Sequence, residues 1–193
     1  MKKFLLVLGI LMFAACSANA YSMPRWSAFP LTIYMPDSQY APIVKSAFES
    51  WKSRSNGLAR FIFKKSHIAS TSSNINIVFY DKLPDGKAYK LTEYYAARAT
   101  YPSKAQNGYF LHTDINIALK DASGKPYSRQ QLKAISLQAI GRAMGIPCQG
   151  GDVGVMVCDE KYNVYDVTKE DYQALVRVYK RVNKSEMEKY ENN

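Results

Sequence analysis

The segment 128–147 constrains the fold more than any other part of the sequence. Ser128 and Gln131 form the S-x-x-Q pattern of a capping box at its start. Gly145 and Pro147 end it, because glycine suits the turn after a helix and proline cannot continue one. Between them the apolar residues recur at the spacing of one helical face, and they are Leu132, Ile135, Ala139, Ile140 and Ala143. The sequence therefore predicts a long helix with a buried stripe.

Strand patterns fill much of the chain before this helix. In 74–80 and 113–119 isoleucine and other apolar residues alternate with polar ones, as a half-buried strand requires. Two shorter apolar segments, 30–36 and 60–64, are also predicted to be strands. Residues 87–111 are rich in tyrosine but poorly periodic, so we expect a loop with an irregular strand.

Two more helices flank these strands. The first carries Val44, Ala47, Phe48 and Trp51 on one face and ends at Asn56-Gly57. The last opens with Thr168-x-x-Asp171, follows a long connection over 146–167, and presents the apolar residues Leu175, Val178, Tyr179 and Val182. The order predicts one mixed α/β (α+β) domain over 21–182, with a small sheet, and a polar tail over 183–193.

The first twenty residues have the pattern of a secretory signal peptide. Lys2 and Lys3 precede the apolar stretch 4–15, and Ala18-Asn19-Ala20 forms an A-x-A cleavage site. We expect cleavage after Ala20 and a secreted or periplasmic product. An alternative remains open, because Phe13-Ala14-Ala15-Cys16 is similar to a bacterial lipobox, in which Cys16 would be lipidated and kept as a membrane anchor.

Composition narrows the function classes. The chain has 193 residues, of which 47% are hydrophobic and 22% charged, which is typical of a globular protein. Its net charge is +10, and loss of residues 1–20 removes two lysines and no acids, which leaves +8. No second long apolar run follows residue 20, so we expect no transmembrane segment in the mature protein. We find no nucleic-acid-binding motif, no phosphate-binding Gly-rich loop and no G-x-S-x-G motif.

A set of short motifs, in a fixed order over residues 26–182, resembles the catalytic domain of the matrixins, zinc metallopeptidases of the metzincin group. The motifs are Ala47-Phe48-x-x-Trp51, Asn74-Ile75-Asn76-Ile77, His112-Thr113-Asp114-Ile115-Asn116-Ile117, Ile140-Gly141-x-Ala143-Met144-Gly145-Ile146, Met156, and Thr168-x-x-Asp171 with Tyr179. The resemblance implies a small mixed sheet, an active-site helix, a C-terminal helix and zinc-dependent peptide hydrolysis.

The zinc motif of that family, H-E-x-x-H-x-x-G-x-x-H followed by a Met-turn, is degenerate here. Aligned on Gly145, its ligand and base positions hold Gln138, Ala139, Arg142 and Cys148, whereas Gly145 and Met156 are kept. Arginine stays protonated, so it brings a positive charge where a cation would sit. Alanine cannot act as a general base. We therefore expect a pseudo-protease with no zinc and no catalytic residue.

Two cysteines of the mature chain bracket the predicted Met-turn. Cys148 stands at the third ligand position and Cys158 follows Met156 by two residues. An exported protein with an even cysteine count favours a Cys148–Cys158 disulfide that replaces the metal as a crosslink. Two free buried thiols, or a metal–thiolate site, remain the alternatives.

Other candidate residues have a functional and a plain structural interpretation. His112 is either a ligand or a polar histidine at a strand edge, with His67 as the other histidine of the chain. Tyr94 and Tyr95 either form a binding surface or pack over the sheet. Gln138 and Arg142, one helical turn apart, either line the remnant of a substrate cleft and bind a carboxylate or peptide, or form an ordinary arginine–acid pair.

These residues predict an exported binding module for a peptide, a protein or an anionic envelope component. The last of these draws on the positive charge and on the basic run Arg177, Lys180, Arg181 and Lys184, which is otherwise a solvated face. The alternatives are an active zinc metalloendopeptidase with a rebuilt site that uses Cys148 and His112, and a surface-anchored structural lipoprotein.

Overall fold

The computed structural model describes residues 24–64, 73–81, 97–100, 108–158 and 163–179. Its order is β1 (Leu31–Tyr34), α2 (Ala41–Arg54), β2 (Phe61–Lys64), β3 (Ile75–Tyr80), β4 (Ala97–Thr100), β5 (Thr113–Ala118), α3 (Arg129–Ala143) and α4 (Lys169–Tyr179). The predicted mixed α/β class is confirmed, as is the predicted order of helices and strands. In the described part of the chain, no helix has the length and apolar character needed to cross a bilayer.

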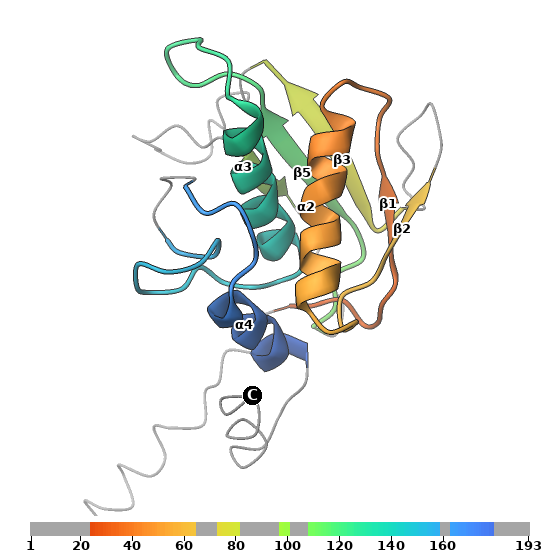
Figure 1. Cartoon of the computed structure of the whole chain (residues 1–193). Coiled ribbons are helices and arrows are strands. Elements are labelled where there is room, and N and C mark those ends of the chain that lie inside the picture. Colours follow the sequence, from red (N-terminus) through yellow and green to blue (C-terminus); the bar gives the residue numbers. More distant parts are fainter. Residues whose placement is uncertain (1–23, 65–72, 82–96, 101–107, 159–162, 180–193) are drawn as a thin grey trace, which may run out of the picture.

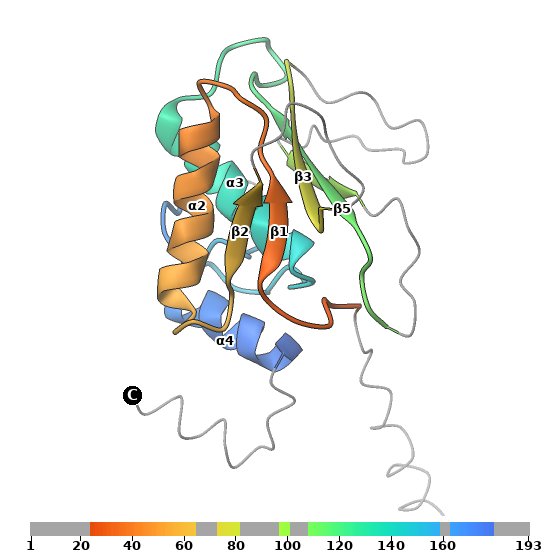
Figure 2. The same ribbon diagram turned by 90° about the vertical axis from the view of Figure 1, so that its right-hand side faces the viewer.

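The five strands form one sheet in the order β2-β1-β3-β5-β4. β1 pairs in parallel with β2 and β3, and β3 pairs in parallel with β5, with Ile75 opposite Thr113. Only β4 runs antiparallel, with Ala97 opposite Ile117. Parallel neighbours need a crossover connection, and α2 provides it between β1 and β2. Figures 1 and 2 show α2 and α3 on one face of the sheet, with α4 at one end of the two helices.

The core lies between the sheet and these two helices. Ile33, Ile75, Ile77, Ile115 and Ile117 point from alternate strand positions into it and are at most 1% exposed. Each of these strands therefore buries one face, as the alternation predicted. Aromatic side chains fill the end of the core near β2, where the Phe48 ring lies 4.9 Å from that of Phe61 and 5.6 Å from that of Phe63.

Two tryptophans bond the C-terminal half of α3 to the rest of the fold. The indole N–H of Trp51 on α2 donates to the carbonyl of Leu137 at 2.9 Å, and that of Trp26 donates to the carbonyl of Ala143 at 2.8 Å. The hydroxyl of Tyr179 on α4 donates to the carbonyl of Met144 at 2.6 Å. Trp26 and Tyr179 therefore satisfy carbonyl groups that the end of a helix leaves without an intrahelical partner.

The capping box predicted at the start of α3 is present. The Ser128 hydroxyl accepts from the Gln131 backbone N–H, and the Gln131 side chain accepts from the Ser128 N–H. At the other end Gly145 has φ +85°, where a Cβ would lie 2.6 Å from the carbonyl oxygen of Pro24. Glycine is therefore needed at this position for its backbone conformation and for the close passage of the N-terminal segment.

Candidate functional site

Helix α3 is enclosed on more sides than its stripe predicted. The predicted face is buried, but Ser136, Leu137, Gln138 and Gly141 are buried as well. The sheet covers one side of α3 and α2 packs along another, while the connection after residue 145 passes over a further side (Figure 1). Gln138, at the first of the positions that the resemblance assigns to zinc chemistry, contacts this connection at Val157.

Gly141 allows two bulky side chains to approach α3. A Cβ at this position would collide with the sulfur of Met156 and would lie 2.9 Å from a ring carbon of Trp51. Met156 and Trp51 are both fully buried. The glycine thus gives up helix propensity so that the methionine of the following turn can pack directly on the helix backbone.

Gln138, at the first ligand position, is committed to a structural hydrogen bond. Its side chain is only 7% exposed, and its amide Nε2 donates to the carbonyl of Val157 at 3.2 Å. The Gln138 side chain therefore links α3 to Val157 and does not face an open cleft.

Ala139 and Arg142 hold the next two positions of the motif. Ala139 is buried and has no atom that can accept a proton. Arg142 is half-buried and lies in the last turn of α3, where a positive charge interacts favourably with the helix dipole. Neither residue offers an electron pair to a metal ion.

Cys148 and Cys158 form the predicted disulfide. Their Cα atoms lie 4.9 Å apart and ten residues separate them along the chain. The two sulfurs are bonded to each other, so the alternatives of free thiols and of a metal–thiolate site do not apply to this structure. The bond closes a loop whose two ends also pair through their backbones, with Gln149 N–H donating to Met156 O at 2.6 Å and Cys158 N–H donating to Gln149 O at 3.2 Å.

Asp171 holds the turn that contains Met156 from the other side. Its carboxylate, 1% exposed, accepts from the N–H groups of Val155 at 2.9 Å and Met156 at 3.0 Å. The same carboxylate accepts from the backbone and hydroxyl of Thr168, and so caps α4. Gly154 has φ +109°, and a Cβ there would lie 2.7 Å from this carboxylate. The sequence predicted that Thr168-x-x-Asp171 opens the last helix, but the bonds of Asp171 to the turn at Met156 depend on tertiary structure.

The donor chemistry of these positions does not fit zinc. Zinc sites in proteins use thiolate, imidazole or carboxylate ligands. Here Gln138 already donates its amide to Val157, and the sulfur of Cys148 is bonded to another sulfur. No cluster of three or more His, Cys, Asp or Glu side chains suited to a metal occurs in the described part of the chain.

His112 lies at the start of β5 within a polar cluster of the sheet. Its Nδ1 is 2.7 Å from the carbonyl of Ser73, and its Nε2 is 3.0 Å from Asp114 Oδ1 and 3.2 Å from Asn76 Nδ2. The ring is 13% exposed. Asn76 belongs to β3, Asp114 belongs to β5, and Ser73 lies two residues before β3, so these contacts do not connect His112 with Gln138 or Arg142.

Several other predicted candidates lie outside the described residues. They are His67, Tyr94, Tyr95, Lys180, Arg181, Val182, Lys184 and the segment 1–20 with Cys16. Of the basic C-terminal run, Arg177 is described. It is exposed and donates to the side chain of Gln149 at 3.0 Å, so it reaches the disulfide-closed loop.

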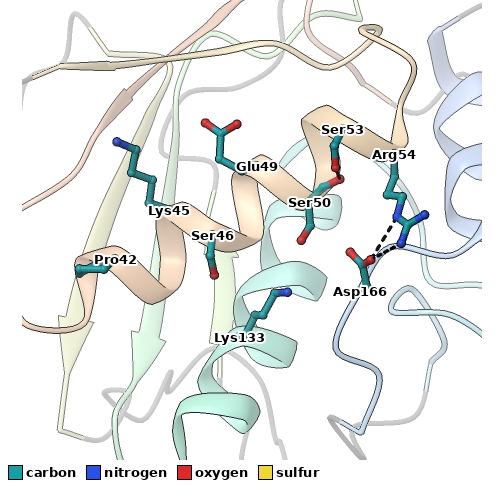
Figure 3. Close-up of a pocket in the computed structure, with 9 residues that line it drawn as sticks. All are labelled: Pro42, Lys45, Ser46, Glu49, Ser50, Ser53, Arg54, Lys133 and Asp166. Atoms are coloured by element: carbon teal, nitrogen blue, oxygen red, sulfur yellow. Dashed lines mark hydrogen bonds and ion pairs between the residues drawn. The ribbon is translucent and has the colours of Figure 1, made fainter.

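An open groove of about 810 Å³ lies on a different surface, between the outer sides of α2 and α3 (Figure 3). Ser46 and Ser50 line it from α2 and Lys133 from α3. At one end Arg54 donates to Asp166 at 2.7 Å. None of the zinc-motif positions lines this groove. Hydroxyl groups and this exposed ion pair line the groove, as is typical of a solvated helix surface.

Asp166 titrates below the ordinary range of an aspartate. Partial burial raises its pKa, but hydrogen bonds from the Arg54 guanidinium and the Val167 N–H lower the pKa by more. This ion pair links the end of α2 to the segment before α4.

Comparison with known proteins adds no relative: no protein-family model matches the chain, and no curated protein matches it either.

Proposed function

We propose that this chain is an exported, matrixin-like protein that binds a peptide or protein without hydrolysing it. The observation that carries the proposal is the Cys148–Cys158 bond, because it removes the thiolate from the third ligand position. At the first ligand position, the hydrogen bond to Val157 commits the Gln138 side chain to a structural contact. A disulfide and a hydrogen bond thus take over the crosslinking that zinc performs in an active relative.

The absence of a base supports the same proposal. Proton transfer by a positioned base contributes about 10²–10⁴-fold to the rate of such reactions. Ala139 supplies no such group, and Arg142 adds a positive charge one turn of helix away. Two unit charges of equal sign repel by about 4 kcal/mol at 4 Å with an effective dielectric constant near 20. A divalent cation close to Arg142 would meet a penalty of this kind or larger.

The edge of the sheet offers a place for an extended peptide. β4 is the outermost strand on the side of β5, and none of the described strands pairs with its outer edge. α3 packs next to β4, so the edge lies beside the helix that carries Gln138 and Arg142. A peptide that adds to such an edge gains backbone hydrogen bonds without any catalytic group.

Export is part of the proposal. The pattern of residues 1–20 and the disulfide both favour an oxidising compartment. The mass of the mature N-terminus tests it. A chain that starts at Tyr21 supports a free secreted or periplasmic protein, and a lipidated Cys16 supports the anchored alternative.

One assay tests binding and hydrolysis together. The protein, secreted into the periplasm of an expression host, is mixed with fluorescein-labelled casein peptides of 10–20 residues, a length chosen to exceed a strand of about five residues. We expect fluorescence anisotropy to rise while mass spectrometry finds the peptides intact.

Other outcomes favour other functions. Cleavage that a zinc chelator abolishes would support an active metalloendopeptidase. No binding to peptides, together with salt-sensitive binding to anionic phospholipid vesicles, would support docking on an envelope component. No binding to either, with a lipidated Cys16, would support a structural lipoprotein.

A further inference from the structure

The loop closed by Cys148 and Cys158 has two halves that are held in different ways. In the inner half, Gly154, Val155 and Met156 are buried, and Val155 and Met156 donate their N–H groups to Asp171. In the outer half, Pro147, Cys148 and residues 150–153 are exposed, with Val153 62% exposed. Figure 1 shows this loop beside the C-terminal half of α3.

Among the residues that the structure describes, few contacts other than the disulfide attach the outer half. They are the backbone hydrogen bonds between Gln149 and the segment 156–158, and the exposed bond from Arg177 to the Gln149 side chain. Hydrogen bonds in contact with water contribute little net stability. Residues 150–153 bury no large apolar side chain. The disulfide is therefore the main constraint on this half, whereas Asp171 and Met156 hold the inner half without it.

Both cysteines are solvent-exposed, so an external thiol can reach the bond. Exposed disulfides of this kind are the ones that exchange readily with thiols. We propose that Cys148–Cys158 is a thiol–disulfide exchange site, and that its reduction by a dithiol releases residues 148–153 while α3 and the inner half of the loop keep their structure. This inference does not depend on peptide binding.

The reaction balances with a dithiol reductant as the second substrate. One thiolate of the reductant attacks one sulfur of the pair and expels the other as a thiolate, which forms a mixed disulfide. The second thiol of the reductant then displaces the protein sulfur and closes its own disulfide. Two electrons pass to the protein, Cys148 and Cys158 end as thiols after protonation, and the dithiol ends oxidised.

Hydrogen exchange on the full secreted chain tests the proposal, with dithiothreitol as the dithiol and alkylation to count free thiols. In the folded protein, we expect reduction to raise the exchange rate of the Gln149 and Cys158 amides, whose hydrogen bonds join the two ends of the loop, about tenfold or more. The amides of Val155 and Met156 and those of α3 should exchange at an unchanged rate. The Cys148→Ser/Cys158→Ser variant should reproduce the reduced pattern without dithiol and should not respond to it.

Each contrary result overturns the proposal. The bond could resist dithiothreitol until denaturant unfolds the chain, which would show that it is not an exchange site in the folded protein. Reduction could leave the exchange of the Gln149 and Cys158 amides unchanged, or could increase exchange throughout α3. Either outcome would show that the disulfide does not selectively control the outer half of the loop.

Discussion

The side-chain amide of Gln138 donates a hydrogen bond to the carbonyl oxygen of Val157 at 3.2 Å, which joins the middle of α3 to the loop that Cys158 closes. Gln138 is 7% exposed, and Val157 is half-buried. A polar side chain in this position is stabilising because its partner is a backbone group that needs one. Gln138 thus performs a structural task at the position that the matrixin resemblance assigns to a metal ligand.

Replacing Gln138 with leucine tests this role. The variant keeps a side chain of similar size but leaves the carbonyl of Val157 without its donor. We expect the free energy of unfolding to fall by about 1–3 kcal/mol, the cost of an unsatisfied buried polar group. Urea denaturation measures it. The control is Gln130→Leu at the exposed start of α3, where the change should stay within about 0.5 kcal/mol.

Asp171→Asn should loosen the turn at Met156. The carboxylate accepts from Val155, Met156 and Thr168, and an amide can replace only one of its two oxygens. We expect a loss of about 2–3 kcal/mol, typical of a buried hydrogen bond to a charged group. The exposed Asp152→Asn is the matched control. Equal thermal melting of the two variants would contradict a structural role of Asp171.

Gly141→Ala should destabilise the fold although alanine favours helices. The new methyl group collides with the Met156 sulfur and approaches a ring carbon of Trp51 at 2.9 Å. Overpacking of this kind costs about 1–3 kcal/mol, against a gain of about 1 kcal/mol in helix propensity. Adding Met156→Ala should make the combined loss smaller than the sum of the two single losses, because the two side chains compete for one space. Denaturant titration of the four proteins gives this coupling.

The control for Gly141 is Gly150→Ala. A Cβ at Gly150 meets no atom within 4 Å. The exposed loop should therefore accept the alanine with a change within about 0.5 kcal/mol. A loss at Gly150 as large as that at Gly141 would show that contact with Met156 is not the cause.

The ion pair of Arg54 and Asp166 should make a small contribution to the free energy of unfolding, and acid should remove this contribution. The pKa of Asp166 is lower in the folded chain than its ordinary value, so its contribution is full above the unfolded pKa of about 3.9. The contribution disappears as the pH falls through the folded pKa. Both side chains are largely exposed, at 60% and 44%, so we expect Asp166→Asn to cost about 0.2–1 kcal/mol at pH 7.

Denaturation at several pH values checks this term. The difference between wild type and Asp166→Asn should shrink below pH 4 and should also shrink in high salt. Asp37→Asn, an exposed acid just before α2, is the comparison. A difference that stays constant from pH 7 to pH 2 would contradict an ionic contribution.

The local pattern of the sequence was sufficient to predict the helices and most strands. The ends of α3 were predicted from the capping box of Ser128 and Gln131 and from the stop at Gly145. The structure confirms all three roles. β4 was predicted only as an irregular strand within 87–111. Its sequence, Ala97-Arg98-Ala99-Thr100, has little intrinsic strand propensity, and pairing with β5 determines its conformation.

The candidate site was less predictable because its contacts are tertiary. Cysteine count and the expected export were enough to predict the disulfide. No periodicity, however, reveals that Gln138 meets the carbonyl of Val157, or that Asp171 reaches back to Met156. From the sequence alone, a glutamine next to the buried stripe could line a cleft or be covered. The folded loop covers Gln138.

The account depends on the disulfide of Cys148 and the hydrogen bond of Gln138, which commit both side chains to contacts other than a metal ion. Elemental analysis of protein secreted into the periplasm and dialysed against zinc-containing buffer, then freed of unbound metal, tests this most directly. We expect no zinc above the buffer blank and two cysteines that resist alkylation until reduced. One tightly bound zinc per chain, lost together with peptide cleavage on chelation, would contradict it.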